Sequence, residues 1–458
     1  MTFLATDQLE TLWKKIEEIS SIPIISQTLT WENGQRVVGR PSASLETVGL
    51  KNGDMIVVTG EPVQKQSEDL VPIPSSGGFG GGRSVDTSIN GNKESVKPTD
   101  LKEEDKSKTP LHQTFESYLR ARRFDTSSLA GSQSYKSIFF DKGRLAKVPP
   151  SVTLTHQPYR HIDHLEFANV AEIQGFVNHW FIDLHGFTQR VGWMYGYYLE
   201  DTNFDEGYRA VVEGIYEPPQ SDGQFLPDPL LATVDEVTSR LGLERVGWVF
   251  TGPARDGLVT AQESVRIAEL QLKYISNEHY TGYPVSKLVT CIVSPDTQKG
   301  QPEIHALMVS DQAVGMVRDK LILVSDQSDK AVRVRQAEKN ERLPLVLQTG
   351  KDVAAFDPDW FVVKVNHGIP LKLRSMFKRS VFRRENRVNS NSNSVRKYID
   401  QVSRSEPSWE RYSDFHLLLF IADKFDKHSA ILLADCIKNK TDIGPDFEAL
   451  IQAFASSR

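Results

Sequence analysis

The chain has 458 residues, of which 39% are hydrophobic and 25% are charged, and its formal net charge is −6. This length allows roughly two to four domains with cores of their own, and the small negative charge excludes a polycation that holds nucleic acid by overall charge. Only two cysteines occur, Cys291 and Cys436, and their wide separation excludes a disulfide framework and a thiolate zinc cluster.

The first 60 residues predict one helix followed by short strands. Apolar residues at Leu9, Leu12 and Ile16 fall on one helical face, and Asp7 precedes them as a candidate N-cap. Strand-like segments and turn signals follow, and this order resembles the ubiquitin-like β-grasp. We therefore expect a β-grasp over residues 1–60, either complete or without its first strand, because too few residues precede the helix for the first hairpin. A small unrelated α+β module is the alternative.

Residues 61–110 are rich in Ser, Gly, Pro, Lys and Asp and have no sustained apolar period. This composition predicts a flexible linker. The glycine tract 77–82 inside it is not followed by Lys and Ser or Thr, so the sequence does not indicate a phosphate-binding loop.

Five histidines fall within a short part of the central region and suggest a metal site. His161 and His164 are separated by three positions, whereas a helical zinc pair needs four with a glutamate between them. We therefore interpret this group as ordinary polar or half-buried histidines, with a ligand role as the less favoured alternative: His156, His161, His164, His179 and His185.

The segment 246–253, with the sequence V-G-W-V-F-T-G-P, resembles the V-G-W-Y-H-S/T-H-P signature of the JAMM metalloproteases. In this alignment the two histidine ligands fall on Phe250 and Gly252, which have no side-chain lone pair for zinc. The catalytic glutamate falls on Gln189, and the Ser-x-x-Asp that follows falls on Thr260 and Glu263. We predict an MPN domain that is not an enzyme and that holds no metal or cofactor.

Several further strings resemble one family, that of nuclear protein localization protein 4. The most specific are I-Y-E-P-P-Q at residues 215–220 and S-D-F-H-L-L-L-F at residues 413–420. Animal and fungal members carry zinc-finger cysteines before the central domain, but here Leu145 and Val148 stand at two of those positions. The chain is therefore similar to the shorter, plant-type members without zinc fingers.

This resemblance implies an adaptor. Its partners would be the valosin-containing AAA ATPase, ubiquitin fusion degradation protein 1 and polyubiquitin, and it would deliver clients to proteasomal or ER-associated degradation. No signal peptide or long apolar run is evident in the sequence. We expect a location in cytoplasm and nucleus, including the cytosolic face of the ER, with no membrane insertion and no nucleic-acid partner.

The binding residues are unknown from sequence, but two groups are candidates. Trp193, Tyr197 and Tyr198 alternate along an expected strand, which places some of them in the core and some on the surface. The apolar face of an expected helix near residues 413–425 is either core or a ubiquitin platform, with candidates Phe415, Leu418 and Leu419. A basic stretch at 372–388 predicts a solvated face, and nucleic-acid contact is its alternative.

The expected fold class is a multidomain α+β protein. It comprises a β-grasp (1–60), a flexible linker (61–110), a remnant of the zinc-finger region without cysteines (111–150), an inactive MPN α/β domain (151–305) and a mixed C-terminal domain ending in helices (306–458). Two other functions remain open, an active JAMM deubiquitinase and an RNA-associated MPN scaffold.

Overall fold

The computed structural model describes residues 7, 9–20, 28–31, 44–48, 50, 56–59, 112–140, 147–201, 203–204, 206–277, 279–298, 300–323, 330–370, 372, 374–387, 390–403 and 405–456. The chain divides into two compact units, residues 1–68 and 69–458. The predicted linker over 61–110 and the zinc-finger position Leu145 lie outside the described residues.

The first unit contains one helix and one antiparallel strand pair. Helix α1 (Leu9–Ser20) is followed by β1 (Thr28–Trp31) and β2 (Ile56–Thr59), which pair from Thr28 opposite Thr59 to Trp31 opposite Ile56. The small core contains Leu12, Ile16, Leu29 and Leu45. The helix and strand pair therefore agree with the apolar pattern, whereas the turn and first-hairpin positions lie outside the described residues.

A closed seven-stranded barrel forms the centre of the second unit, with the order β12-β15-β16-β22-β7-β9-β8. Its mixed pairing is parallel for β12 with β15, β22 with β7 and β7 with β9, and antiparallel elsewhere. The strands are β7 (His164–Phe167), β8 (Val191–Glu200), β9 (Tyr208–Tyr216), β12 (Glu244–Thr251), β15 (Val289–Pro295), β16 (Pro302–Val309) and β22 (Val362–Gly368).

Alternation along the strands gives the barrel two apolar sides. Met194 of β8 packs in the core shared with helix α3, whereas its neighbours Trp193 and Tyr195 pack in the core shared with the other helices. Each of these two cores is a continuous cluster of buried side chains. The helices are α3 (Val170–Asn178), which continues as the π-helical turn η3 (His179–Asp183), α4 (Leu231–Leu241), α5 (Ala261–Lys273) and α6 (Asp311–Arg318).

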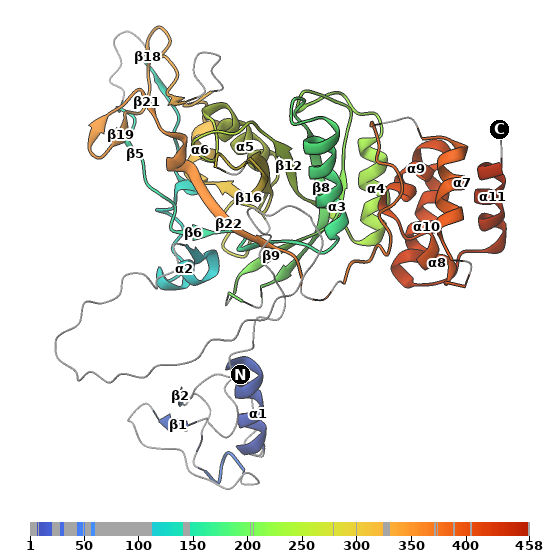
Figure 1. The fold of residues 1–458 in the computed structure, drawn as a ribbon. Helices are drawn as coiled ribbons and strands as arrows, with labels where there is room; N and C mark the ends of the chain where they lie inside the picture. The colour runs from blue at the N-terminus through green and yellow to red at the C-terminus, as the bar shows by residue number, and fades with distance from the viewer. Residues whose placement is uncertain are drawn as a thin grey trace, which may run out of the picture. The chain divides into compact units, whose positions relative to one another are not determined.

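Short strand pairs and turns surround the barrel, and helix α2 (Phe115–Ala121) follows β3 near β6 (Figure 1). The pairs are β3 (Gln113–Thr114) with β6 (Tyr159–Arg160), β4 (Ile138–Phe139) with β18 (Glu341–Arg342), β10 (Gln220–Ser221) with β11 (Gln224–Phe225), β13 (Ile275–Ser276) with β14 (Val285–Ser286) and β17 (Val332–Arg333) with β21 (Ala355–Phe356). A three-stranded sheet contains β5 (Val152–Thr153), β19 (Val346–Gln348) and β20 (Lys351–Asp352), and the 3-10 turns are η2 (Ala130–Ser132) and η4 (Pro358–Phe361).

The C-terminal helices lie together beside α4 (Figure 1). They are α7 (Ser392–Gln401), α8 (Ser408–Arg411), α9 (Phe415–Lys424), α10 (Lys427–Asn439) and α11 (Pro445–Ser456). Helices α9 and α10 pack on α4, so the barrel and the helical region share one core. The mixed α/β, multidomain class expected from the sequence is confirmed.

None of the helices in the described part of the chain is long and apolar enough to span a membrane.

Candidate functional site

The positions aligned with the JAMM metal site come together at the end of β12. The Thr251 hydroxyl donates to Gln189 Oε1 at 2.7 Å and accepts from the Arg190 backbone N–H at 2.8 Å. Phe250 is buried and stacks on Trp248 with ring centroids 4.7 Å apart. The chain therefore brings Gln189 close to the end of β12, as the alignment requires, but it uses Phe250 as core.

A guanidinium group lies beside the second aligned histidine position. A Cβ atom built on Gly252 would lie 3.7 Å from Nη1 of Arg255. Arg255 also donates to Glu263 Oε1 at 2.8 Å and to the Leu258 carbonyl at 3.0 Å. An arginine stays charged in proteins, so this position holds a fixed cation that repels a metal ion.

Thr260 and Glu263 form the N-terminal cap of α5. Thr260 Oγ1 accepts from the Glu263 backbone N–H at 3.2 Å, and Glu263 Oε2 accepts from the Thr260 backbone N–H at 2.9 Å. This reciprocal capping box satisfies donors that the first helical turn leaves open. Together with Arg255, it engages both Glu263 oxygens, and neither aligned residue is placed as a metal ligand.

Metal-ligating side chains do not gather elsewhere in the described part of the chain. No group of three or more His, Cys, Asp or Glu is placed there to hold a metal ion. The predicted histidine group is dispersed into separate contacts. His161 bonds to Asp311 at 2.9 Å, His164 contacts Asp201, and His156 stacks on Trp360.

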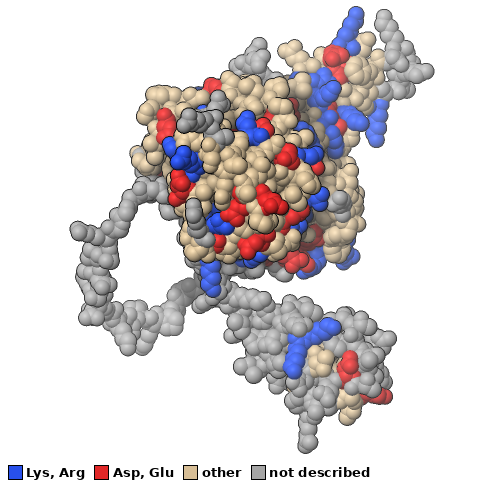
Figure 2. All heavy atoms as spheres, turned by 90° about the vertical axis from the view of Figure 1, so that its right-hand side faces the viewer, with Lys and Arg blue, Asp and Glu red and all other residues tan. Residues whose placement is uncertain are grey.

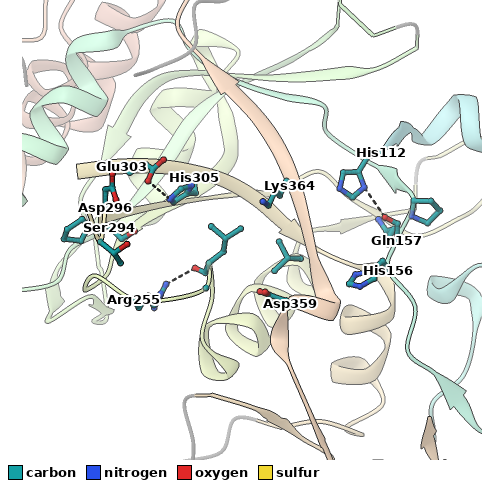
Figure 3. Close-up of a pocket in the computed structure, with 16 residues that line it drawn as sticks. His112, His156, Gln157, Arg255, Ser294, Asp296, Glu303, His305, Asp359 and Lys364 are labelled. Atoms are coloured by element: carbon teal, nitrogen blue, oxygen red, sulfur yellow. Dashed lines mark hydrogen bonds and ion pairs between the residues drawn. The ribbon is translucent and has the colours of Figure 1, made fainter. Parts of the chain in front are cut away.

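A groove of about 670 Å³ begins at Arg255 and runs along β16 and β22. In Figure 3, Arg255, Glu303 and His305 lie on one side of β22, and His112 and His156 lie on the other. The remaining lining includes acidic, basic and apolar side chains: Gln157, Pro158, Gly257, Leu258, Ser294, Pro295, Asp296, Thr297, Asp359, Val362 and Lys364.

Two groove histidines are held in their neutral form. Burial lowers the pKa of His305, and the nearby Lys364 and Arg255 lower it further against the opposing effect of Glu303. Burial also lowers the pKa of His112, whose Nδ1 donates to the Gln157 carbonyl at 3.1 Å. At neutral pH the groove therefore offers uncharged imidazoles among a mixture of acids and bases, which suits a polypeptide more than a strongly charged ligand.

The register of β22 leaves part of its backbone beside this groove without a second neighbour. Residues 362–365 pair with β16 alone, and only residues 366–368 pair with β7. Among the described residues, the first half of β22 thus has a strand on one side only, and on its other side the Arg160 guanidinium donates to the Lys364 carbonyl at 3.4 Å. Such an edge can accept an added extended strand.

The basic stretch at 372–388 is only in part the solvated face that its composition predicts. Arg384 is buried between Glu172 and Glu217, at 3.4 and 3.5 Å, and Arg387 also pairs with Glu217. Arg374 contacts both oxygens of the buried Glu166 at 3.1 Å. The prediction is therefore wrong for Arg384 and Arg387, whose carboxylate partners lie about 170 to 210 residues earlier in the chain. It agrees with the exposed positions of Lys372, Arg374, Lys378 and Arg383.

Figure 2 presents the side of the C-terminal helices, where basic and acidic side chains are interspersed. Lys and Arg gather more densely on the part of the chain at the upper right of this view.

His416 connects this stretch to helix α9. Its Nε2 lies 3.0 Å from Glu172 and its Nδ1 lies 3.0 Å from Glu385. Burial alone would lower the pKa of His416, but the two carboxylates raise it to about 10. Burial would likewise raise the pKa of Glu172, but Arg384 and His416 lower it to about 2. Together with Glu217 and Arg387, these residues form a buried cluster of charged groups between the barrel and the C-terminal helices, which we call the joint.

The residues proposed to bind a partner lie mostly in the interior. Phe415, Leu418 and Leu419 are fully buried, and Trp193 is 5% exposed and stacks on Phe225 at 4.7 Å. These four side chains offer no surface to a partner, as expected if they are part of the core. Tyr197 and Tyr198 are half-buried, and the Tyr198 hydroxyl donates to the Lys287 carbonyl at 3.0 Å. Val148 is exposed.

Sequence reasoning missed the groove and Arg255. A signal for part of it exists, because the polar Lys364 alternates with the buried Val363 and Val365 along β22. The position of Arg255 depends on how the loop after β12 turns back, and no local pattern predicts that.

The chain is similar to curated proteins of one kind. The NPL4 family matches residues 190–451. The nuclear protein localization protein 4 homolog of Drosophila melanogaster is 31% identical over 319 residues, covering 61% of this chain and 48% of that protein. Nuclear protein localization protein 4 of Saccharomyces cerevisiae is 28% identical over 391 residues, covering 71% and 66%. The human homolog is 28% identical over 316 residues, covering 60% and 50%, so the match spans about half the length of the fly and human relatives.

Proposed function

Because the chain belongs to the NPL4 family, we propose that it is a non-catalytic adaptor of the ubiquitin pathway. It binds polyubiquitinated proteins and, with ubiquitin fusion degradation protein 1, delivers them to the valosin-containing AAA ATPase for unfolding and for proteasomal or ER-associated degradation. It acts in cytoplasm and nucleus and at the cytosolic face of the ER. In this proposal residues 1–60 are the ubiquitin-like β-grasp, 61–110 the linker, 111–150 the remnant of the zinc-finger region, 151–305 the inactive MPN domain and 306–458 the C-terminal domain.

The arrangement at the end of β12 carries the non-catalytic part of the proposal. A JAMM hydrolase needs three protein ligands for zinc and a free carboxylate that takes a proton from the bound water. Phe250 and Gly252 supply no donor atom, and both oxygens of Glu263 are engaged by Arg255 and by the helix cap. The cation of Arg255 makes the position unfavourable for a metal in any case.

The groove supports polypeptide binding at the same place. An extended segment added along residues 362–365 of β22 would hydrogen-bond through its backbone, which is independent of sequence. Its side chains would meet the neutral His305 and the charged Glu303 and Lys364. For an adaptor of this family, the segment would be an unfolded stretch of ubiquitin.

Two measurements on the full-length chain test the proposal. Immobilised chain is exposed to polyubiquitin, and separately to the AAA ATPase with and without ubiquitin fusion degradation protein 1. We expect retention of polyubiquitin and of the ATPase. Retention of neither would refute the adaptor, whereas stoichiometric zinc with chelator-sensitive cleavage of the chains would establish the deubiquitinase instead.

A charge reversal tests the groove itself. Lys364 is exposed and lines the groove, so Lys364→Glu changes its charge without disturbing the core. Lys351→Glu on β20 makes the same change at an exposed position outside the groove. We expect the first variant to weaken polyubiquitin retention several-fold relative to the second, on the order of 1 kcal/mol. Equal retention by the two variants would place the binding site elsewhere.

A further inference from the structure

A second cavity, separate from the groove, lies between α2, the 274–288 segment and the ends of β8 and β9. Its volume is about 1070 Å³, and it shares no lining residue with the groove. Aromatic and acidic side chains make up much of its wall, including Tyr198, Tyr208, Glu200 and Glu244. The cavity is large enough to take several side chains of a bound peptide.

His161 lines this cavity but is already engaged within the chain. It is 4% exposed, and its Nε2 lies 2.9 Å from Asp311, which also accepts hydrogen bonds from the hydroxyls of Tyr159 and Tyr283.

The cavity already receives one cation of the chain itself. The ammonium group of Lys287 lies 4.2 Å from the ring centre of Tyr208 and 5.5 Å from that of Tyr198. No carboxylate of the described residues pairs with Lys287, so its contacts with the ring faces are the ones that hold it. Burial raises the pKa of Tyr208, and the nearby Glu116 and Glu200 raise it further, which indicates negative potential at this ring.

Most other charges of the wall are satisfied within the chain. Glu116 bonds to His279 at 2.8 Å, and Arg245 bonds to Asp235 at 2.8 Å. Glu200 is exposed and has no ion pair in the described part of the chain. The Glu200 carboxylate is therefore open to a ligand, and a ligand ammonium can take the place of Lys287 at the tyrosine rings. A ligand that matches them brings donors and positive charge.

From these observations we propose that the cavity binds a lysine-bearing extended segment of a protein partner, with an ammonium group placed between Glu200 and the rings of Tyr198 and Tyr208. Aromatic side chains at the rim favour a polypeptide over a free polyamine. Tyr280 is 67% exposed and contacts Phe124, which is 50% exposed, so apolar parts of a peptide find a surface beside the charged cavity. This binding is independent of the adaptor proposal and of the groove.

The test uses the full-length chain and a fluorescein-labelled Gly/Ser peptide with spaced lysines, followed by fluorescence anisotropy. Glu200→Gln removes the exposed carboxylate, and we expect about three- to tenfold weaker binding. Glu269→Gln removes one exposed carboxylate from α5, outside the cavity, and controls for the change in net charge. Affinities that are equal in the two variants would overturn the proposal.

A second variant is expected to bind the peptide more tightly, and misfolding cannot produce a gain in affinity. Lys287→Met removes the ammonium that occupies the rings of Tyr198 and Tyr208, so we expect the peptide to bind about three- to tenfold more tightly. Unchanged or weaker binding would contradict the placement of the ligand ammonium at these rings.

Two further arms identify the source of the cation. The same peptide with acetylated lysines should bind at least about tenfold more weakly, because acetylation removes the charge. Spermidine should compete only at concentrations well above the dissociation constant of the peptide. Equal binding of the acetylated peptide, or competition by spermidine at concentrations similar to the peptide's, would refute a lysine-bearing polypeptide as the ligand.

Discussion

Replacing His416 with glutamine removes the central cation of the joint between the barrel and the C-terminal helices. The imidazolium lies 3.0 Å from carboxylate oxygens of both Glu172 and Glu385, and its side chain is 1% exposed. Glutamine can still donate one hydrogen bond, but it brings no charge to two carboxylates, one of which is fully buried. The variant therefore tests whether the joint depends on an ion pair or only on hydrogen bonding.

The structure sets the expected magnitude. A rise of the His416 pKa from 6.5 to about 10 corresponds to roughly 5 kcal/mol of preference for the charged form at 1.36 kcal/mol for each pKa unit. Removing one partner of a buried ion pair costs about 3–5 kcal/mol. We expect the free energy of unfolding of His416→Gln to fall by about 3–5 kcal/mol at pH 6.5 or below.

The pH dependence separates the ion pair from simple packing. Because the pKa in the folded state is above the unfolded value, the stabilisation is fully present below pH 6.5 and is lost as the pH rises toward about 10. The stability difference between the wild-type chain and His416→Gln should then shrink by about 1.4 kcal/mol per pH unit across this window.

The assay is urea unfolding of the full-length chain, followed by tryptophan fluorescence at several pH values between 6 and 10. His428→Gln is the matched control, since His428 is exposed on α10 and its replacement should change the stability by less than about 0.5 kcal/mol at every pH. A difference between wild type and His416→Gln that stays constant with pH would refute a buried imidazolium and leave only a packing role.

Three other predictions follow from buried groups and from the loop after β12. The pKa values of Glu172 and Glu217 are each lowered to about 2 by arginine and histidine neighbours, so the stability that these carboxylates contribute is complete above pH 4.5 and is lost as the pH falls through 2. In limited proteolysis at decreasing pH, the joint should be cut before the barrel. Simultaneous cleavage of both regions would contradict this. Burial raises the pKa of the Cys291 thiol, so a thiol reagent at neutral pH should modify at most Cys436 in the native chain and both cysteines in urea, as mass spectrometry can establish. Arg255→Ala removes its bonds to Glu263 and Leu258 and should lower the free energy of unfolding by about 1 kcal/mol; a loss above about 3 kcal/mol in thermal or urea unfolding would mean that this loop supports the core.

Local patterns predicted some of these features and had the signal for others. The T-x-x-E spacing of Thr260 and Glu263 is a helix-start signature. The sequence alone could therefore have predicted their capping box in place of a remnant of a catalytic site. In α9 the sequence F-H-L-L-L-F-I-A is apolar on every side of the helix, a pattern typical of a buried helix and not of a platform. The core positions of Phe415, Leu418 and Leu419 follow from it.

Long-range pairing explains what no local pattern could predict. The density of arginines near residue 384 predicts a solvated face only if no acids lie nearby in space. Glu166, Glu172 and Glu217 come from β7, α3 and the segment after β9, and the barrel brings them to the arginines. The same limit applies to the groove, whose walls come from residues as far apart as His112 and Lys364.

The two most specific sequence strings have a structural role that follows from this arrangement. Glu217 of I-Y-E-P-P-Q holds Arg190 and Arg387, and Asp414 of S-D-F-H-L-L-L-F caps α9 while it accepts the backbone N–H groups of Val381 and Phe382. Both strings therefore encode the joint and not a ligand surface. Substitutions in them should reduce polyubiquitin binding only as far as they unfold the joint, whereas Lys364→Glu should reduce it at unchanged stability. Measuring binding and unfolding on the same variants thus distinguishes the part of the sequence that specifies the architecture from the part proposed to bind.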